Sequence, residues 1–287
     1  MLQAGRDSLV VVRKLLWHAI CSIGVGMGLG ICIDELDAEY DLPSGRIEAL
    51  SRINLEVLPG EFLCILGESG CGKSTLLRIL AGLQVPTGGS VQVNGTKITG
   101  PNSQVGVVFQ NPALLPWLTV EKNVGLGFRI RGESSPGPRI RECIDLVGLR
   151  GFEAMRPKSL SGGMAQRAAI ARALVGNPEV LLMDEPFSSL DAITRSRMQR
   201  ELQEIWRRRP ITIVFVTHDI DEAVVLGTRV VVMTPRPGRV GRILQIPLEY
   251  PRSRRAPDFV RLKSMIADEL LDLGVNGVAA ETPPKEV

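Results

Sequence analysis

One nine-residue segment has the residue types and spacing of a phosphate-binding loop. Residues 67–75 read GESGCGKST, which fits the pattern G-x-x-x-x-G-K-[ST]. Glycines permit a tight loop whose backbone N–H groups converge on phosphate oxygens, and a following helix adds partial positive charge. Lys73 would reach the terminal phosphates and Ser74 would bind Mg²⁺. A chance match is roughly one in a hundred at average glycine usage, so we predict a nucleoside triphosphate site built from Gly67, Glu68, Ser69, Gly70, Cys71, Gly72, Lys73, Ser74 and Thr75.

Two adjacent carboxylates follow an apolar run further along the chain. Residues 180–183 are all apolar, and Asp184 and Glu185 come next. Such a run is common, and taken alone it indicates only a strand that meets solvent. A buried parallel strand at this position would deliver Asp184 to a metal ion beside Ser74 and let Glu185 polarise the attacking water. We therefore assign Asp184 to Mg²⁺ and Glu185 to water, a general-base role worth about 10² to 10⁴ in rate.

The elements that would position these residues can be read from the hydrophobic pattern. A strand of alternating polarity around residues 53–57 and an apolar run at 62–66 flank the Pro59-Gly60 turn. Residues 191–209 have helical periodicity. Because strands alternate with helices, we expect a parallel core sheet. Further strands are expected at 180–183, 211–216 and 230–233, a turn-rich strand pair at 86–100, and a helical lobe at about 111–170.

Composition excludes some classes of protein and leaves the function open. The 287 residues include 34 Lys or Arg and 31 Asp or Glu, a net charge of +3, which does not indicate a nucleic-acid binder. The five cysteines are scattered and form no C-x-x-C pair, so we expect a reducing compartment and no zinc site.

Residues 160–167, LSGGMAQR, resemble the signature motif LSGGQ-x-x-R of ABC ATPases, with Met164 in place of the usual Gln. The string also reads as a helix N-terminus with Ser161 as its cap, and both interpretations can hold. In the family this helix N-terminus faces the γ-phosphate bound by the other subunit of a head-to-tail dimer, where exposed N–H groups bind the anion. The resemblance implies a homodimer in which Ser161, Gly162 and Gly163 contact nucleotide.

Four further residues match landmarks of the same family. Gln110 resembles the Q-loop glutamine that contacts Mg²⁺ and water, although a surface glutamine is the simpler alternative. Asp191 resembles the D-loop aspartate, here in Ser-Leu-Asp rather than the usual Ala-Leu-Asp. His218, at the end of a predicted strand where α/β sheets bind ligands, resembles the switch histidine that holds the γ-phosphate. Tyr40 lies where the family has an aromatic residue that stacks on adenine, and packing on the β lobe is the alternative.

The resemblance covers residues 28 to about 250 and implies an α/β P-loop NTPase fold, the ABC ATPase domain, with a parallel core sheet, an antiparallel β lobe and an α-helical lobe. It implies an ATPase that uses ATP and Mg²⁺ and lies peripherally at the cytoplasmic face of the inner membrane. The implied partners are permease subunits and a periplasmic or extracellular solute-binding protein, with no nucleic acid. One alternative is an ABC-type ATPase that acts on DNA or ribosomes, but such proteins generally carry two cassettes or coiled-coil insertions, and this sequence shows neither. Another is a non-hydrolysing ATP-binding module, which would be expected to lack Glu185 or His218, and both are present.

Residues 107–127 and 230–251 look like those of the nitrate, sulfonate and taurine importer ATPases within this family. Residues 114–118, LLPWL, form either an internal hydrophobic cluster or a docking groove for a helix of the permease. We favour docking. Cargo contacts the other components in this family, so the transported molecule is open.

The two ends of the chain carry weaker signals. Residues 15–33 are uncharged, and we favour a first strand at 28–35 preceded by a 1–27 extension that is disordered or not translated, over a membrane helix or signal peptide. After residue 251, the basic residues Arg252, Arg254 and Arg255 indicate a solvated turn rather than a phosphate patch. A disordered tail is expected from residue 277 onward. An amphipathic helix before it is expected from the spacing of five apolar residues: Phe259, Leu262, Ile266, Leu270 and Leu273.

Overall fold

The computed structural model describes residues 29–279, with gaps at positions 44, 135 and 210. The predictions for residues 1–28 and for the tail from 280 onward lie outside the described residues. The first strand, β1 (Ile31–Leu42), begins later and runs further than the predicted 28–35. Over the described part of the chain, no helix has both the length and the apolar character needed to cross a bilayer.

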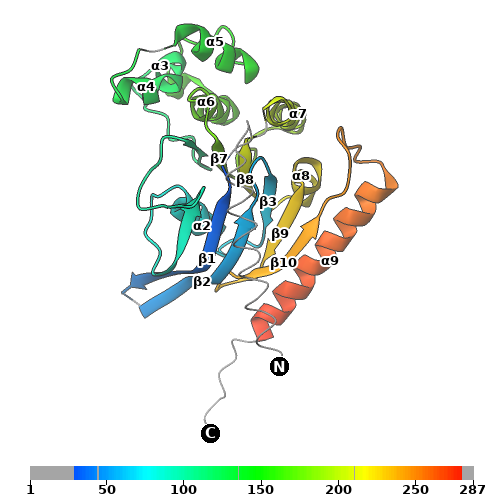
Figure 1. Cartoon of the computed structure of the whole chain (residues 1–287). Helices are drawn as coiled ribbons and strands as arrows, with labels where there is room; N and C mark the ends of the chain where they lie inside the picture. The colour runs from blue at the N-terminus through cyan, green and yellow to red at the C-terminus, as the bar shows by residue number, and fades with distance from the viewer. Residues whose placement is uncertain (1–28, 44, 135, 210, 280–287) are drawn as a thin grey trace.

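The core of the molecule is a six-stranded sheet in the order β10-β9-β3-β8-β7-β6 (Figure 1). Five of these strands are parallel neighbours, which confirms the predicted parallel core, and β10 pairs antiparallel with β9. Every residue of β3, β7 and β8 is buried, since helices or the second sheet cover both faces. The strand bounds are β3 Phe62–Leu66, β6 Val105–Val108, β7 Val180–Asp184, β8 Thr212–Thr217, β9 Arg229–Met233 and β10 Val240–Gln245.

A second, antiparallel sheet confirms the predicted β lobe. Its order is β2-β1-β4-β5, where β2 is Gly45–Val57, β4 is Gly88–Val93 and β5 is Thr96–Lys97. Ile53, Leu55 and Val57 of β2 are buried and alternate with less buried neighbours, as their sequence pattern predicts. Helix α2 (Lys73–Leu80) packs between the two sheets and shares one hydrophobic core with them.

The predicted helical lobe lies at one end of the core sheet (Figure 1). Its elements are α3 (Val120–Val124), α4 (Leu126–Ile130), α5 (Gly137–Leu146), the 3-10 turn η1 (Pro157–Ser159) and α6 (Gly162–Leu174). The fully buried Asn123 accepts a hydrogen bond from the Leu115 N–H at 2.8 Å and donates to the carbonyls of Leu115, Leu118 and Thr119. One buried amide therefore fixes the loop that precedes α3.

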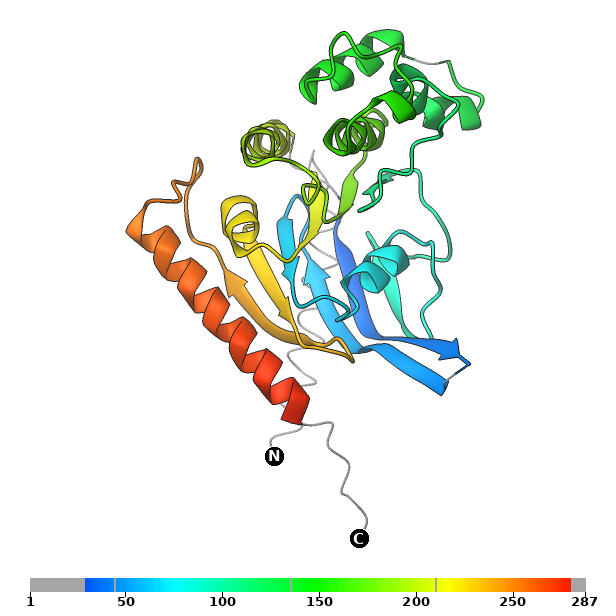
Figure 2. The same ribbon diagram turned by 180° about the vertical axis from the view of Figure 1, so that it is seen from behind.

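Three more helices cover the sheet: α7 (Ala192–Arg208), α8 (Ile220–Leu226) and α9 (Pro257–Ala279). Both views show α9 lying along the β10 edge (Figures 1 and 2). Phe259 and Ile266 of α9 are buried in the main core, and Leu262, Leu270 and Leu273 pack against it, which confirms the predicted amphipathic helix. The helix runs to Ala279, and disorder of the tail stays a prediction.

The expectation of a solvated basic turn is wrong for Arg252. Its guanidinium donates to the carbonyl of Val224 and to that of Gly227, both at 2.6 Å, and lies 4.0 Å from the ring centroid of Tyr250. Burial lowers the pKa of this arginine. Arg252 thus closes the C-terminal end of α8, where carbonyl groups lack helical partners.

Candidate functional site

The segment 67–75 connects β3 to α2 and wraps around its own lysine. The Lys73 side chain is buried, and its Nζ donates to the carbonyls of Gly67 and Glu68, each at 2.7 Å. Gly72 has a φ of 97°, and a Cβ at this position would lie 2.7 Å from the carbonyl oxygen of Ala49. Only glycine fits this approach at the N-terminus of α2, the kind of position where unpaired backbone N–H groups can bind an anion.

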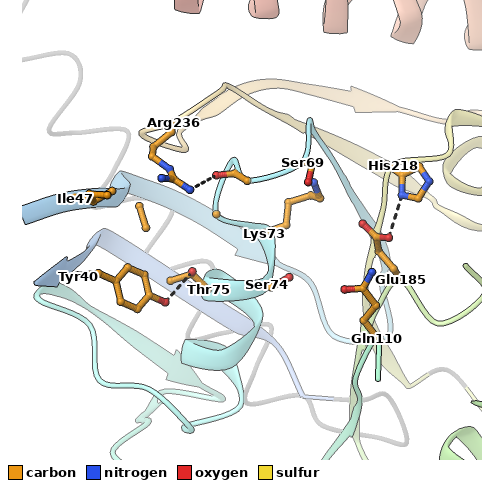
Figure 3. A pocket seen from close by; sticks show the side chains of 13 residues that line it. Tyr40, Ile47, Ser69, Lys73, Ser74, Thr75, Gln110, Glu185, His218 and Arg236 are labelled. Atoms are coloured by element: carbon orange, nitrogen blue, oxygen red, sulfur yellow. Dashed lines mark hydrogen bonds and ion pairs between the residues drawn. The ribbon is translucent and has the colours of Figure 1, made fainter. Parts of the chain in front are cut away.

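The outer face of the loop forms one wall of a cavity of about 660 Å³ (Figure 3). Tyr40 and Ile47 lie at one end of this cavity, and Gln110, Glu185 and His218 lie at the other. The core sheet explains why Gln110, Glu185 and His218 meet, because they follow the parallel strands β6, β7 and β8, whose carboxyl ends share one edge. Tyr40 and Ile47 reach the cavity from the antiparallel sheet. The lining residues are Tyr40, Ile47, Ala49, Ser69, Gly70, Gly72, Lys73, Ser74, Thr75, Gln110, Glu185, His218 and Arg236.

Glu185 and His218 are in direct contact. Nδ1 of His218 lies 3.0 Å from Oε2 of Glu185, and the imidazole is far more exposed than the carboxylate, at 64% against 19%. Glu185 directly follows β7 and has a φ of 42°, while His218 directly follows β8. A carboxylate beside an imidazole can accept a proton from water and orient a charged substrate group, which is the chemistry of a hydrolytic site.

Asp184 is the last residue of β7, and its side chain contacts that of Ser74 without lining the cavity. Burial raises the pKa of its carboxyl, a hydrogen bond with the Ser74 side chain opposes this rise, and the neighbouring charge of Glu185 adds to it. Among the described residues, no group of three or more His, Cys, Asp or Glu side chains is arranged to hold a metal ion. A cation here would therefore use Asp184, the Ser74 hydroxyl and the Gln110 amide, together with ligands from outside the protein.

Tyr40 lies at the cavity wall and is held there by its hydroxyl group. Its hydroxyl lies 3.0 Å from Oγ1 of Thr75 and donates to Oε1 of Gln84, so the phenol is tied to the first turn of α2 and to the loop beyond that helix. The side chain also lines the cavity, at the end opposite His218 (Figure 3). A fixed aromatic ring at this wall is suited to a flat ligand group.

Several predicted residues lie outside the cavity lining. Oγ of Ser161 accepts a hydrogen bond from the Met164 N–H at 3.2 Å, so Ser161 is the N-cap of α6. Asp191 caps α7, and the hydrogen bond from the backbone of Thr194 lowers the pKa of its carboxyl. The others absent from the lining are Gly162, Gly163, Gly67, Glu68, Cys71 and Asp184. Gly67 to Cys71 belong to the loop itself, whereas residues 161–163 and Asp191 belong to the α6 and α7 N-termini.

Three lining residues were not predicted from the sequence: Ile47, Ala49 and Arg236. Ile47 and Ala49 belong to β2 and offer no chemical signal. Arg236 lies in the turn between β9 and β10, where Nη2 donates to the carbonyl of Gly70 at 3.3 Å. This turn has the sequence Arg-Pro-Gly-Arg, which by itself does not indicate contact with the phosphate loop.

Comparisons with known proteins find relatives over most of the chain. A family model described as ABC transporter matches residues 50–188. An uncharacterized ABC transporter ATP-binding protein of Methanocaldococcus jannaschii is 48% identical over 249 residues, covering 86% of this chain and 93% of that protein. The aliphatic sulfonates import ATP-binding protein of Bacillus subtilis is 47% identical over 220 residues, covering 77% and 86%. A solved dimeric ATP-binding cassette in a post-hydrolysis state with ADP and Pi has a TM-score of 0.70 and 34% identity, covering 76% of this chain and 100% of that chain.

Proposed function

Because this chain belongs to the ABC transporter family of ATP-binding subunits, whose members bind and hydrolyse ATP, we propose that it powers import of a small anion or organic solute through a separate permease. The cargo class we propose is of the nitrate, sulfonate or taurine type. The Bacillus subtilis relative, named for aliphatic sulfonates import, supports this choice. The polypeptide segment we assign to the ABC ATPase domain is 28–250, followed by a C-terminal helix and tail at 251–287.

The observation that carries the ATP-hydrolysing part of the proposal is the convergence of Lys73, Glu185 and His218 on one cavity. Lys73 would bind the terminal phosphates, its ammonium moving from the loop carbonyls to phosphate oxygens. Glu185 would polarise the attacking water, and His218, at 3.0 Å from it, would hold the γ-phosphate so that water and phosphorus stay aligned. The backbone of residues 67–75 would cradle the phosphates, and Tyr40 would stack on adenine.

The donor set beside the loop fits Mg²⁺. Ser74, Gln110 and Asp184 supply a hydroxyl, an amide and one carboxylate, and Mg²⁺ commonly takes one or two carboxylates while keeping water and substrate phosphates as ligands. A bound cation would also favour the ionised form of Asp184, whose desolvation otherwise raises its pKa. When bound, this ion neutralises negative charge on the phosphoryl group during transfer.

We propose that two copies of the chain complete two sites. Ser161, Gly162 and Gly163 lie outside this chain's cavity, and both Ser161 and Gly162 are exposed, so they are available to the nucleotide of a second copy. Ile193, beside Asp191 in the first turn of α7, is 84% exposed, which supports a covering partner at this surface. The solved relative with ADP and Pi is itself dimeric. ATP would favour the closed dimer, and loss of the γ-phosphate would reopen it.

The loop before α3 supports the permease contact. Trp117 is 66% exposed, although Asn123 fixes the backbone on both sides of it. A large exposed aromatic side chain on a loop with a fixed backbone is typical of a partner site. We propose that Trp117 docks a helix of the permease at the cytoplasmic face of the membrane, and that a solute-binding protein delivers the cargo on the other side.

The proposal is tested by recovering the protein with its partners. The tagged chain is purified from gently solubilised membranes of its own cell without ATP, and co-purifying proteins are identified by mass spectrometry. A multi-span permease is expected, and Trp117→Asp should reduce its recovery while ATPase activity of the isolated chain is retained. Recovery of ribosomal or DNA-associated proteins in place of a permease would overturn the importer assignment.

A further inference from the structure

The turn between β9 and β10 is clamped between the β lobe and the phosphate loop. The Gly238 N–H donates to the carbonyl of Ala49, and the Ser51 N–H donates to the carbonyl of Gly238, both at 3.0 Å. On the other side, a Cβ at Gly238 would lie 2.0 Å from the carbonyl oxygen of Cys71. The turn is therefore held by backbone contacts to two neighbouring segments.

Arg236 extends from this clamped turn to the cavity. Its Nη2 donates to the carbonyl of Gly70 at 3.3 Å, and the side chain lines the cavity wall (Figure 3). A guanidinium has five N–H donors, so one long hydrogen bond to a neutral carbonyl leaves most of them unused. Among the described lining residues, Lys73 and Arg236 are the two that are lysine or arginine.

The position of Arg236 indicates which part of a nucleotide it faces. Figure 3 shows Arg236 on the Tyr40 and Ile47 side of Lys73, away from Glu185 and His218. A nucleotide with its base at Tyr40 and its γ-phosphate near His218 would have its α-phosphate and sugar on the Arg236 side. Guanidinium groups bind phosphate oxygens through paired N–H donors, a geometry that lysine cannot reproduce.

We propose that Arg236 is a nucleotide-binding residue that contacts the α-phosphate and the adjoining sugar, an inference that rests on the proposed function. This residue contributes to binding of ATP, ADP and AMP alike, because all three carry the α-phosphate. Interactions that are equal in the ground state and the transition state lower KM and leave kcat unchanged. Arg236 therefore contributes to nucleotide affinity together with Lys73 and the loop backbone, while Glu185 and His218 act on the rate.

Groups other than Arg236 already hold the β9–β10 turn in place, so Arg236 is not needed for that purpose. The Thr234 N–H donates to the Arg239 carbonyl at 3.0 Å, and the Arg239 guanidinium reaches Oγ of the buried Ser51 at 3.5 Å. Arg239 does not line the cavity. It is exposed, like Arg236, and lies in the same turn, so Arg239→Gln removes the same charge from the same turn and is the matched control.

The test uses the full chain and measures dissociation constants for ATP, ADP and AMP by competition against a fluorescent nucleotide, together with kcat at saturating ATP. Arg236→Gln is expected to weaken all three nucleotides by one common factor of about 10 or more, as loss of a charged hydrogen bond predicts, with kcat within about twofold of wild type. Arg236→Lys should recover part of the affinity, and Arg239→Gln should bind as wild type does.

Three results would overturn the inference. Unchanged affinity in Arg236→Gln would show that no nucleotide contact exists. Weakening of ATP alone would move the contact to the γ-phosphate, and equal weakening in Arg239→Gln would show a general effect of charge in the turn. If Arg236→Gln fails to fold, the three nucleotides are compared in Arg236→Lys instead. Binding of ATP, ADP and AMP by Arg236→Lys as tightly as by wild type would then contradict the inference. Failure of the wild-type chain to bind ATP at all would instead overturn the proposed function.

Discussion

Two helix N-termini in this molecule differ in how much of a binding site they contain. At α2, Lys73 is buried against two loop carbonyls, and Gly72 packs so closely on β2 that no side chain fits. At α6, Ser161 and Gly162 are exposed, and a Cβ on Gly162 would meet nothing within 4 Å. The first site is shaped by contacts within one chain. The second has the N–H groups of an anion site but no neighbouring wall, so its geometry depends on what covers it.

The largest expected effect is on turnover in Glu185→Gln, a variant that should still bind ATP at α2 and still pair with α6 of a second copy. Glu185→Gln removes the group assigned to polarise water and leaves Lys73 in place, so turnover should fall by about 10² to 10⁴ while ATP affinity stays within about threefold. With hydrolysis blocked, ATP should also hold the variant as a dimer. Steady-state phosphate release, equilibrium ATP binding and size-exclusion chromatography check these expectations, and normal turnover would remove Glu185 from its assigned role.

Lys73→Ala should remove most of the ATP affinity at the N-terminus of α2. The ammonium is the buried positive charge of the loop, and losing charged hydrogen bonds to phosphate should weaken ATP binding roughly 100-fold. Direct titration of ATP onto the monomeric chain measures this. Affinity close to that of wild type would mean that the loop backbone alone supplies the binding energy.

Gly162→Val should act only on the α6 side. The open space around Gly162 means that the monomer should bind ATP normally and lose less than about 1 kcal/mol of stability. Turnover should nevertheless drop at least about tenfold, because the side chain would shield the helix N–H groups from a second copy's nucleotide. Gly176→Val, at the other end of α6 and equally uncrowded, is the control. Equal losses in both variants would point to helix damage instead.

The smallest expected effect concerns Asp184 in the absence of nucleotide and metal. Burial raises its folded pKa above the ordinary value of 3.8, so the folded chain binds more protons than the unfolded chain in the window just above 3.8. Stability then falls as pH rises through that window, and at pH 7 the ionised carboxylate is destabilising. Asp184→Asn should therefore melt about 2 °C or more above wild type at pH 7.

Thermal unfolding of Asp184→Asn and wild type at pH 7 and pH 4, with a chelator present, measures this difference. The gap should shrink at the lower pH, because protonation relieves the wild-type carboxyl as well. A gap that stays the same at both pH values would indicate lost packing or hydrogen bonding rather than charge.

The sequence predicted the structure well for strands that are buried on both faces and for site residues that lie in one continuous segment. The continuous apolar runs of β3, β7 and β8 predicted buried strands, and the spacing of residues 67–75 predicted the loop that connects β3 to α2. Strand β10 was not predicted because it is an edge strand with mixed burial and no regular alternation.

Long-range contacts to carbonyl oxygens explain why the roles of Arg236 and Arg252 were not predicted. Arg236 and its partner Gly70 are 166 positions apart, and Arg252 binds carbonyls at Val224 and Gly227 that no pattern marks as acceptors. Backbone oxygens have no residue-type signature, so an arginine that binds them is indistinguishable in sequence from a solvated one.

The backbone at Glu185 has an evolutionary consequence. Its φ of 42° lies in the left-handed region, which costs a residue with a long side chain about 1 kcal/mol or more relative to glycine. Glycine or asparagine would relieve this strain, so a screen that selects only for heat resistance should enrich such replacements at position 185 and recover chains that are sturdier but inactive. With the role proposed for Glu185, one residue lowers stability and supports turnover, so selection on stability alone should not preserve it.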